Sequence, residues 1–116
     1  MVKNGDVCNI AGKDKEPMKR ILLKLSGEAL AGSEKKGFDE ATVVAVAKQI
    51  RAVAEEGTQI GIVIGGGNFW RGRTSETINR NKADQIGMLA TVMNCIYVSD
   101  ICRYLGLKTE IFTPFV

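Results

Sequence analysis

Two short apolar runs, each continuous and each ending in a glycine-bearing turn, constrain the fold of this chain more than any other feature. Residues 20–25 read Arg-Ile-Leu-Leu-Lys-Leu and lead into Ser26-Gly27. Residues 59–64 read Gln-Ile-Gly-Ile-Val-Ile and lead into Gly65-Gly66-Gly67-Asn68. A continuous apolar run of this length predicts a strand covered on both faces, since a half-exposed strand would alternate apolar and polar residues.

A pattern typical of an amphipathic helix lies between the two runs. Asp39 is expected to cap its first turn through the side-chain carboxylate, with Phe38 and Val43 placed as a hydrophobic staple. Gly57 can adopt the left-handed conformation that ends a helix. The apolar positions at helical spacing are Val43, Ala47, Ile50 and Ala54.

A longer helix is expected from about Asp84 to Leu105, ended by Gly106. Residues 107–112 follow it as a third candidate strand. The apolar stripe of this helix is expected to comprise Leu89, Val92, Met93, Ile96 and Ile101, as part of a core or of a subunit interface.

The order strand, helix, strand, helix, strand predicts an α/β fold with a mainly parallel sheet, because each helix is long enough to cross over the sheet. Such a thin layer leaves an apolar face or an open edge, which suggests truncation or an obligate partner. Residues 1–18 are expected to form a polar, flexible tail and residues 19–116 the folded part.

Composition excludes several classes of protein. The 116 residues suffice for one domain and not for two. The absence of histidine excludes a histidine base, a histidine-containing triad and histidine-ligated zinc. A net charge of +3 is too mild to indicate a nucleic-acid partner. No run approaches the ~18–20 apolar residues of a membrane span, so no membrane partner is expected.

The cysteines indicate the compartment. Cys8, Cys95 and Cys102 are odd in number and include no Cys-x-x-Cys pair, so neither a disulfide framework nor a metal cluster is expected. Cys95 and Cys102 share one face of a helical stretch, as two buried thiols would. This usage favours a reducing, cytoplasmic environment, and the polar start of the chain lacks the apolar segment of a signal peptide.

The glycine-bearing turns are the candidates for a binding site. In open α/β sheets ligands bind beyond the carboxyl ends of the strands, where glycine lets backbone N–H groups approach a phosphate closely. Lys24 and Arg71 could place positive charge at the same mouth. The glycine triplet alone is equally compatible with a tight strand-to-loop turn.

Two common phosphate-binding motifs do not fit this sequence. No Gly-x-x-x-x-Gly-Lys-[Ser/Thr] segment occurs, and Trp70 stands where a dinucleotide fingerprint requires its third glycine. A dinucleotide-dependent oxidoreductase is therefore only a distant alternative.

Four segments taken together are far more specific. They are residues 24–30 (Lys-Leu-Ser-Gly-Glu-Ala-Leu), residues 63–68 (Val-Ile-Gly-Gly-Gly-Asn), Arg71-Gly72, and Asp84 with residues 87–94 (Gly-Met-Leu-Ala-Thr-Val-Met-Asn). In this order they resemble the bacterial UMP kinases (uridylate kinases), which are members of the amino acid kinase family. The resemblance covers about residues 19–116, the first half of the family's usual length, and implies an incomplete amino acid kinase-like three-layer α/β/α sandwich.

The resemblance implies phosphoryl transfer from ATP to UMP, giving UDP for pyrimidine nucleotide biosynthesis. Lys24 would be the catalytic residue, neutralising charge on the transferred group. Mg²⁺ would arrive with ATP and bridge its phosphates. The implied ATP-binding residues are Lys24, Leu25, Ser26, Gly27, Gly67 and Arg71, and the implied UMP-binding residues are Gly66 and Asp84.

The resemblance also implies regulation and assembly. The helix that begins near Asp84 would contribute dimer contacts within a homo-hexamer. GTP and UTP are the effectors that the resemblance suggests. The loop that matches part of a GTP effector site in some members comprises Gly32, Ser33, Glu34, Lys35, Lys36 and Gly37.

Each implied role has a simpler structural alternative. Lys24 could extend its head to solvent from an apolar strand, and Arg71 could be a solvated loop charge. Asp84 could serve only as the cap of its helix. Phe69 and Trp70 are expected in core or subunit contacts rather than stacked on a base.

The second half of the family's domain carries the loop that grips the UMP phosphate and most of the adenine pocket. Half a nucleotide site binds weakly, because the remaining contacts must overcome the entropy of association. The chain alone is therefore expected to be a poor catalyst or none. Three hypotheses stay open: a UMP kinase, an amino acid kinase-family enzyme with another acceptor, and a non-catalytic nucleotide-binding or subunit-assembly module.

Overall fold

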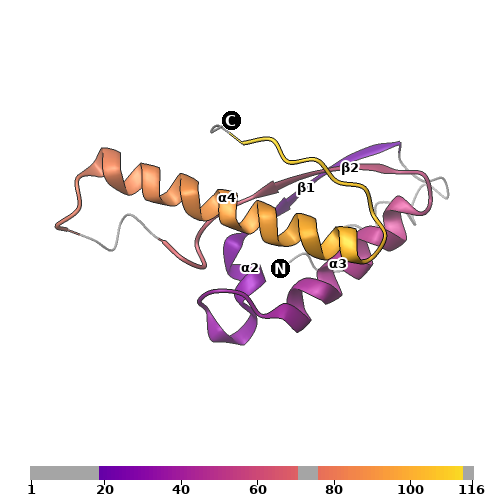
Figure 1. Cartoon of the computed structure of the whole chain (residues 1–116), viewed down its shortest axis with the longest axis horizontal. Coiled ribbons are helices and arrows are strands. Elements are labelled where there is room, and N and C mark those ends of the chain that lie inside the picture. Colours follow the sequence, from indigo (N-terminus) through magenta and orange to yellow (C-terminus); the bar gives the residue numbers. More distant parts are fainter. Residues whose placement is uncertain (1–18, 71–75, 114–116) are drawn as a thin grey trace.

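The structure is a computed structural model that describes residues 19–70 and 76–113. The expected tail of residues 1–18 lies outside the described residues. Figure 1 shows the elements in chain order: β1 (Arg20–Leu25), α2 (Gly27–Ala31), the 3₁₀ helix η1 (Gly32–Glu34), α3 (Glu40–Ala54), β2 (Gln59–Ile64) and α4 (Arg80–Tyr104).

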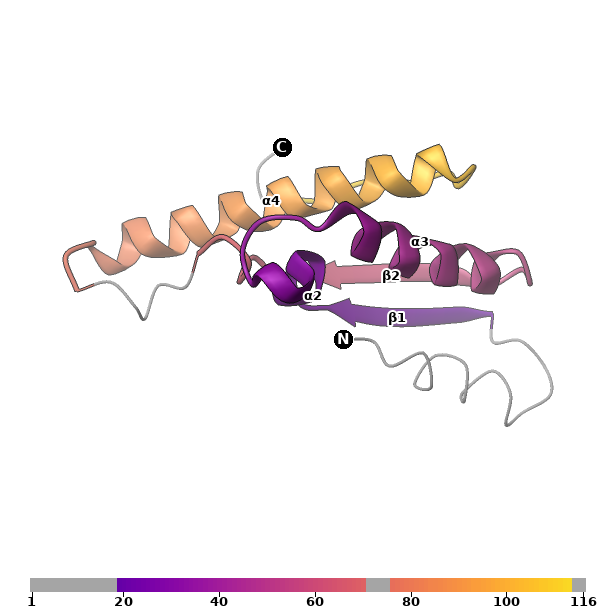
Figure 2. The same cartoon turned by 90° about the horizontal axis from the view of Figure 1, so that it is seen from below.

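The two strands form a parallel pair, as the order of strands and helices along the sequence predicted. Their register runs from Arg20 opposite Gln59 to Leu25 opposite Ile64. Parallel pairing requires a crossover connection, which α2, η1 and α3 supply. Both glycine-bearing turns therefore leave the sheet at the same edge (Figure 2).

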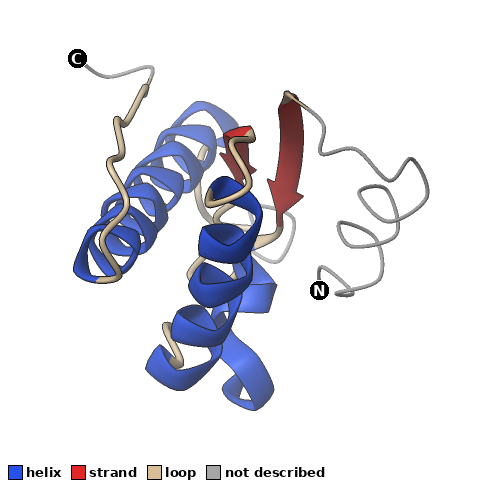
Figure 3. Cartoon of the chain, turned by 90° about the vertical axis from the view of Figure 1, so that its right-hand side faces the viewer, coloured by secondary structure: helices blue, strands red, loops and turns tan. Residues whose placement is uncertain are grey.

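Only one face of the sheet is covered in the described part of the chain. Leu25 and Ile64 are buried, whereas Leu22 is 76% and Val63 51% exposed on the other face. Figure 3 shows α3 and α4 together on one side of the strands. The prediction of strands covered on both faces is therefore wrong for these residues, and the expected open apolar face is confirmed. Two layers of the expected three are present.

Helix α3 follows its sequence pattern closely. The Asp39 carboxylate accepts a hydrogen bond from the Thr42 N–H at 3.2 Å and thereby caps the first turn. Gly57 has φ 93°, the left-handed conformation expected where the helix ends. The buried face consists of Val43, Val46, Ala47 and Ile50.

Helix α4 begins earlier and packs on a different face than expected. Asn79 is its N-cap and accepts from the Asn81 N–H at 2.8 Å, so Asp84 lies inside the helix and is not its cap. The expected apolar stripe is largely on the surface: Leu89, Met93 and Ile96 are 54%, 46% and 55% exposed. Small residues of α4, rather than this stripe, face the sheet layer and allow the helix to approach it closely. The buried face consists of Ala83, Ala90, Asn94, Val98 and Cys102.

Residues 107–112 do not form the predicted third strand. Their segment is held beside α4, where the hydroxyls of Ser99 and Thr109 lie 2.6 Å apart. A groove of about 550 Å³ lies between this segment, α4 and the outer side of β2. No backbone pairing joins residues 107–112 to β2, so the sheet of the described residues has two strands.

By length and composition alone, α4 is apolar enough to cross a membrane. The helix nevertheless packs against α3 and β2 and holds the fully buried, polar Asn94. Mostly buried core helices of globular proteins meet the same criterion, whereas 22% of the apolar window of α4 is buried.

Replacing Leu30 by alanine tests the position of the core. Leu30 has no exposed surface, so Leu30→Ala should lower the free energy of unfolding by about 2–5 kcal/mol through lost burial and a cavity. Leu22→Ala is the matched control, because Leu22 is 76% exposed. Urea denaturation followed by circular dichroism measures both. Equal losses would contradict the assignment of the covered sheet face.

Candidate functional site

The two glycine-bearing turns lie in direct contact. A Cβ atom added to Gly27 would stand 2.7 Å from the Asn68 Oδ1, 2.7 Å from the Gly67 nitrogen and 2.8 Å from the Gly65 oxygen. These distances are too short for any side chain larger than hydrogen. Gly65 also donates its N–H to the Leu25 carbonyl at 3.2 Å. The carboxyl ends of both strands therefore form one continuous backbone surface.

The second turn also packs against α4. A Cβ atom on Gly66 would stand 3.0 Å from the Ala90 Cβ and 3.1 Å from both the Gly87 oxygen and the Thr91 nitrogen. Asp84 is exposed and precedes Gly87 by about one helical turn. The helix thereby brings an exposed carboxylate close to the glycine turn.

A pair of buried asparagines is hydrogen-bonded to the glycine turn at residues 65–67. Asn68 and Asn94 are 1% and 0% exposed and exchange two side-chain hydrogen bonds, of 3.1 and 2.7 Å. Asn94 also donates to the Gly65 carbonyl at 2.7 Å. Asn68 donates to the Gly37 carbonyl at 2.9 Å. The pair thus connects the glycine turn, α4 and the end of the loop 32–37.

Three aromatic rings, two of them near this pair in the sequence, pack against one another. Phe38 stacks on Tyr97 with ring centroids 3.8 Å apart, and Phe69 meets Phe38 edge-on at 5.2 Å. Partial burial, followed by the nearby carboxylates of Glu40 and Asp39, raises the pKa of the Tyr97 phenol. The ring stays neutral at physiological pH, and Phe69 contributes to packing, as expected.

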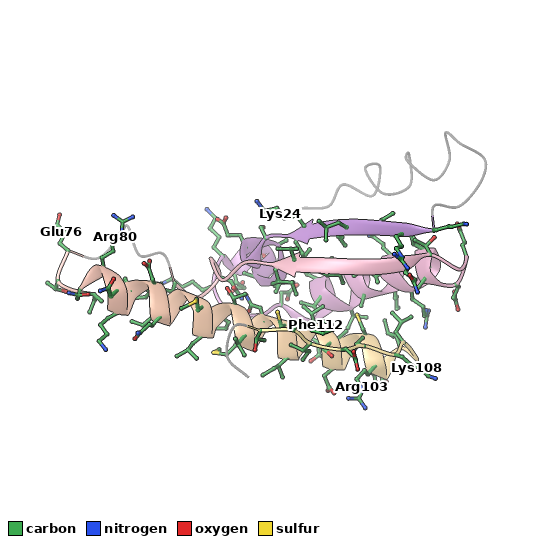
Figure 4. All side chains as sticks on the ribbon, turned by 90° about the horizontal axis from the view of Figure 1, so that it is seen from above. Lys24, Glu76, Arg80, Arg103, Lys108 and Phe112 are labelled. Carbon is green, nitrogen blue, oxygen red and sulfur yellow. The ribbon has the colours of Figure 1, made fainter. Side chains whose placement is uncertain are left out.

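Lys24 is exposed near the carboxyl end of β1 and belongs to the open face of the sheet (Figure 4). Ser26 caps α2, accepting from the Ala29 N–H at 3.2 Å. The side chain of Leu25 is in the core, with 1% of its surface exposed, which leaves only its backbone for a ligand. A lysine ammonium, a serine hydroxyl and glycine backbone thus meet at one edge.

The other predicted site residues are distributed around this edge. Arg71 lies outside the described residues. The loop 32–37 begins with η1 and contains three residues with positive φ: Gly32 (φ 60°), Lys35 (φ 66°) and Gly37 (φ 68°). Lys35 and Lys36 are exposed. Only the end of this loop is tied to the glycine turn, through Asn68.

This edge suits an anion better than a metal ion. Among residues 19–70 and 76–113, no group of three or more acidic or cysteine side chains could hold a metal. The open glycine backbone and an exposed lysine are groups that suit phosphate oxygens. The arrangement can therefore position phosphates and stabilise their negative charge.

Asn68 and Asn94 belong to two of the quoted motifs, but the sequence pattern predicted no role for them. A signal was present in the helix. Asn94 falls between Ala90 and Val98 at four-residue spacing, so a polar residue interrupts the small, apolar face of α4. A buried amide in such a face requires partners, and Asn68 after the glycine triplet was an available one.

The match to known families agrees with this geometry. Residues 19–115 match the sequence model of the Amino acid kinase family. Because that match covers most of the chain, the chain belongs to the amino acid kinase family.

The most informative relatives are uridylate kinases. The chain is 48% identical over 98 residues to the uridylate kinase of Fervidobacterium nodosum, covering 84% of this chain and 42% of that protein. It is 44% identical over 109 residues to the chloroplastic uridylate kinase PUMPKIN of Arabidopsis thaliana, covering 90% of this chain and 32% of that protein. The chain thus spans less than half the length of these relatives and matches their N-terminal part.

Solved structures show the same fold. The UMP kinase of Bacillus anthracis matches with a TM-score of 0.71 at 37% identity, over 77% of this chain and 37% of that one. The UMP kinase of Ureaplasma parvum matches with a TM-score of 0.72 at 32% identity, over 78% of this chain and 41% of that one. The expected amino acid kinase-like fold is confirmed.

Adding one methyl group at Gly27 tests the contact between the turns. Gly27→Ala should lower the free energy of unfolding by about 1–3 kcal/mol, because the backbone of Gly65 and Gly67 must move to admit the Cβ. Gly61→Ala is the matched control, since the nearest atom there is the flexible end of Leu22, at 3.4 Å. Urea denaturation measures both variants. A Gly27→Ala chain as stable as Gly61→Ala would refute the contact.

Proposed function

We propose that this chain supplies the phosphate-facing part of a UMP kinase, which transfers a phosphoryl group from ATP to UMP and yields UDP. The observation that carries the proposal is the contact of Gly27 with Gly65 and Gly67 at the edge where Lys24 is exposed. Phosphoryl transfer requires mainly positioning and charge stabilisation from the protein. Backbone donors and one lysine supply both.

Each residue at this edge has a task in the proposed reaction. Lys24 stabilises negative charge on the transferred phosphoryl group, and the backbone of Ser26, Gly27 and Gly67 lines the ATP phosphates. Gly66 faces UMP. Asp84, about one turn from Gly87, accepts hydrogen bonds from the ribose hydroxyls of UMP. We assign Leu25 a backbone role only, because its side chain is buried. Arg71 retains its proposed role toward ATP.

Magnesium fits this proposal as a companion of ATP. The described residues offer no acidic cluster for a metal, and Mg²⁺ is commonly bound largely through substrate phosphates. When bound there, the ion neutralises phosphate charge. The residues of this chain hold the phosphates rather than the ion.

The exposed stripe of α4 supports a homo-oligomer. Ile86, Leu89, Met93 and Ile96 are 37–55% exposed and follow one another at the three- and four-residue spacing of helix-packing seams. We propose that the stripe packs against a second copy of the chain, within a hexamer. The loop 32–37, with exposed Lys35 and Lys36, is retained as the proposed contact for GTP or UTP.

A non-catalytic module remains the second candidate function, and one observation favours it. The chain spans only 42% of the length of the Fervidobacterium relative, and half a nucleotide site binds weakly. We also propose a reducing cytoplasmic compartment, since Cys95 and Cys102 are free and burial raises the pKa of both thiols.

A phosphoryl-transfer assay tests the proposed reaction. ATP, Mg²⁺ and UMP, CMP or AMP are offered to the chain alone and to the chain mixed with the C-terminal part of a uridylate kinase. UMP-selective turnover should appear in the mixture and fall by ~100-fold or more in Lys24→Ala, which removes charge stabilisation of the transition state. Lys48→Ala, an exposed lysine of α3, is the matched control. A folded, inactive mixture would favour the non-catalytic module.

Placing a charge in the α4 stripe tests the oligomer. Leu89→Glu should convert assemblies of the chain to monomers, because a buried unpaired carboxylate at a subunit contact is costly. Gln85→Glu, also exposed on α4, should leave the assembly intact. Light scattering after size-exclusion chromatography measures the mass. A wild-type chain that is monomeric at all concentrations would contradict the proposed contact.

A further inference from the structure

The buried pair of Asn68 and Asn94 is a closed hydrogen-bond network. The four side-chain N–H groups of the pair make four bonds: two within the pair, one to Gly65 and one to Gly37. Each Oδ1 accepts one bond from the other residue. An amide is required at both positions, because each side chain must donate two bonds and accept one.

The bond to Gly65 determines how the next residue presents its N–H. The carbonyl of Gly65 and the N–H of Gly66 belong to one planar peptide unit and point in opposite directions. Asn94 holds that carbonyl on the side of α4 at 2.7 Å. The Gly66 N–H is therefore directed away from this amide. A glycine triplet has little intrinsic preference for one peptide orientation, so the orientation depends on this bond.

The bond to Gly37 holds the turn from its other end. Asn68 donates to the Gly37 carbonyl and its own carbonyl accepts from the Gly37 N–H at 3.0 Å. The Gly66 carbonyl accepts from Phe69 and Trp70 at 3.0 and 3.1 Å. The pair thus supplies the donors that the described residues offer to the Gly65 and Gly37 carbonyls, one in the turn and one in the loop that contacts it.

We propose that Asn68 and Asn94 are positioning residues that hold the Gly65–Gly67 turn in the orientation that binds nucleotide. This inference rests on the proposed function, because it assigns the N–H groups of Gly66 and Gly67 to nucleotide oxygens. A leucine of similar size could fill the space but would remove the side-chain donors that the pair gives to the Gly65 and Gly37 carbonyls. The pair acts through the turn and touches no substrate itself.

Asn94→Asp tests the proposal with an almost isosteric change. At neutral pH the buried carboxylate has no N–H for the Gly65 carbonyl and faces that oxygen and the Asn68 Oδ1. Neither described partner of Asn94 is charged, so these partners do not compensate the new charge. Burial then raises the pKa of this aspartate. As the pH falls below that pKa, the carboxyl becomes neutral and one donor returns. Asn81→Asp, on the exposed start of α4, is the matched control.

The readout is the backbone amide NMR spectrum of the isotope-labelled 116-residue chain, first without ligand and then with UMP or with Mg²⁺ and ATP. In Asn94→Asp at pH 8, the amide signals of Gly66, Gly67 and Gly37 should shift or broaden together, and nucleotide affinity should fall about tenfold or more. At pH 5 both should return toward wild type. Wild type and Asn81→Asp should not show this pH-dependent recovery.

The two proposals fail in different ways. A wild-type chain whose glycine signals respond to neither nucleotide contradicts the proposed function, while the ligand-free spectra still decide the positioning role. Unchanged glycine signals in Asn94→Asp overturn that role, and so does a loss of affinity that acid does not recover. If the variant does not fold, the side-chain amide protons of wild-type Asn68 and Asn94 are compared with those of Asn81. Equally fast exchange with solvent would overturn the proposal.

Discussion

The contact between two backbone turns is the constraint on which the rest of the structure depends. Gly27 lies so close to Gly65 and Gly67 that no side chain fits between them. This approach is possible only because β1 and β2 are parallel neighbours in register, which brings their carboxyl ends to one edge. Parallel pairing also requires the crossover through α3. The small residues of α4 allow that helix to pack against the turn at Gly66.

The buried asparagine pair extends this constraint into the helical layer. Gly66 rests on the backbone of α4 at Gly87, and Asn94 bonds the preceding carbonyl from the same helix. A polar network in a core is stable only when every member is satisfied, and the side-chain N–H groups of this one are. The candidate phosphate-facing turn is therefore held by α4 rather than by the sheet alone.

Two surfaces of the described residues expose large apolar side chains. The outer face of the sheet exposes Leu22 and Val63, and α4 exposes Leu89 and Ile96. Large apolar side chains gathered on one face mark a site of contact. The chain also covers less than half of its uridylate kinase relatives. We propose that the open sheet face packs against the remainder of an amino acid kinase domain and the α4 stripe against a second copy.

The sequence by itself determined the local elements and the family. Periodicity and capping residues placed α3, since Asp39 and its apolar positions act within a few residues of one another. The motifs placed Lys24 and both glycine turns at strand ends. Tertiary structure decided which face of each element is buried, because that depends on what packs against it: β1 and β2 are covered on one face only, α4 buries Asn94 and exposes Leu89, and residues 107–112 lie beside α4 without joining the sheet. The partnership of Asn68 with Asn94 joins residues 26 positions apart, and only the packing of the turn against the helix brings them together.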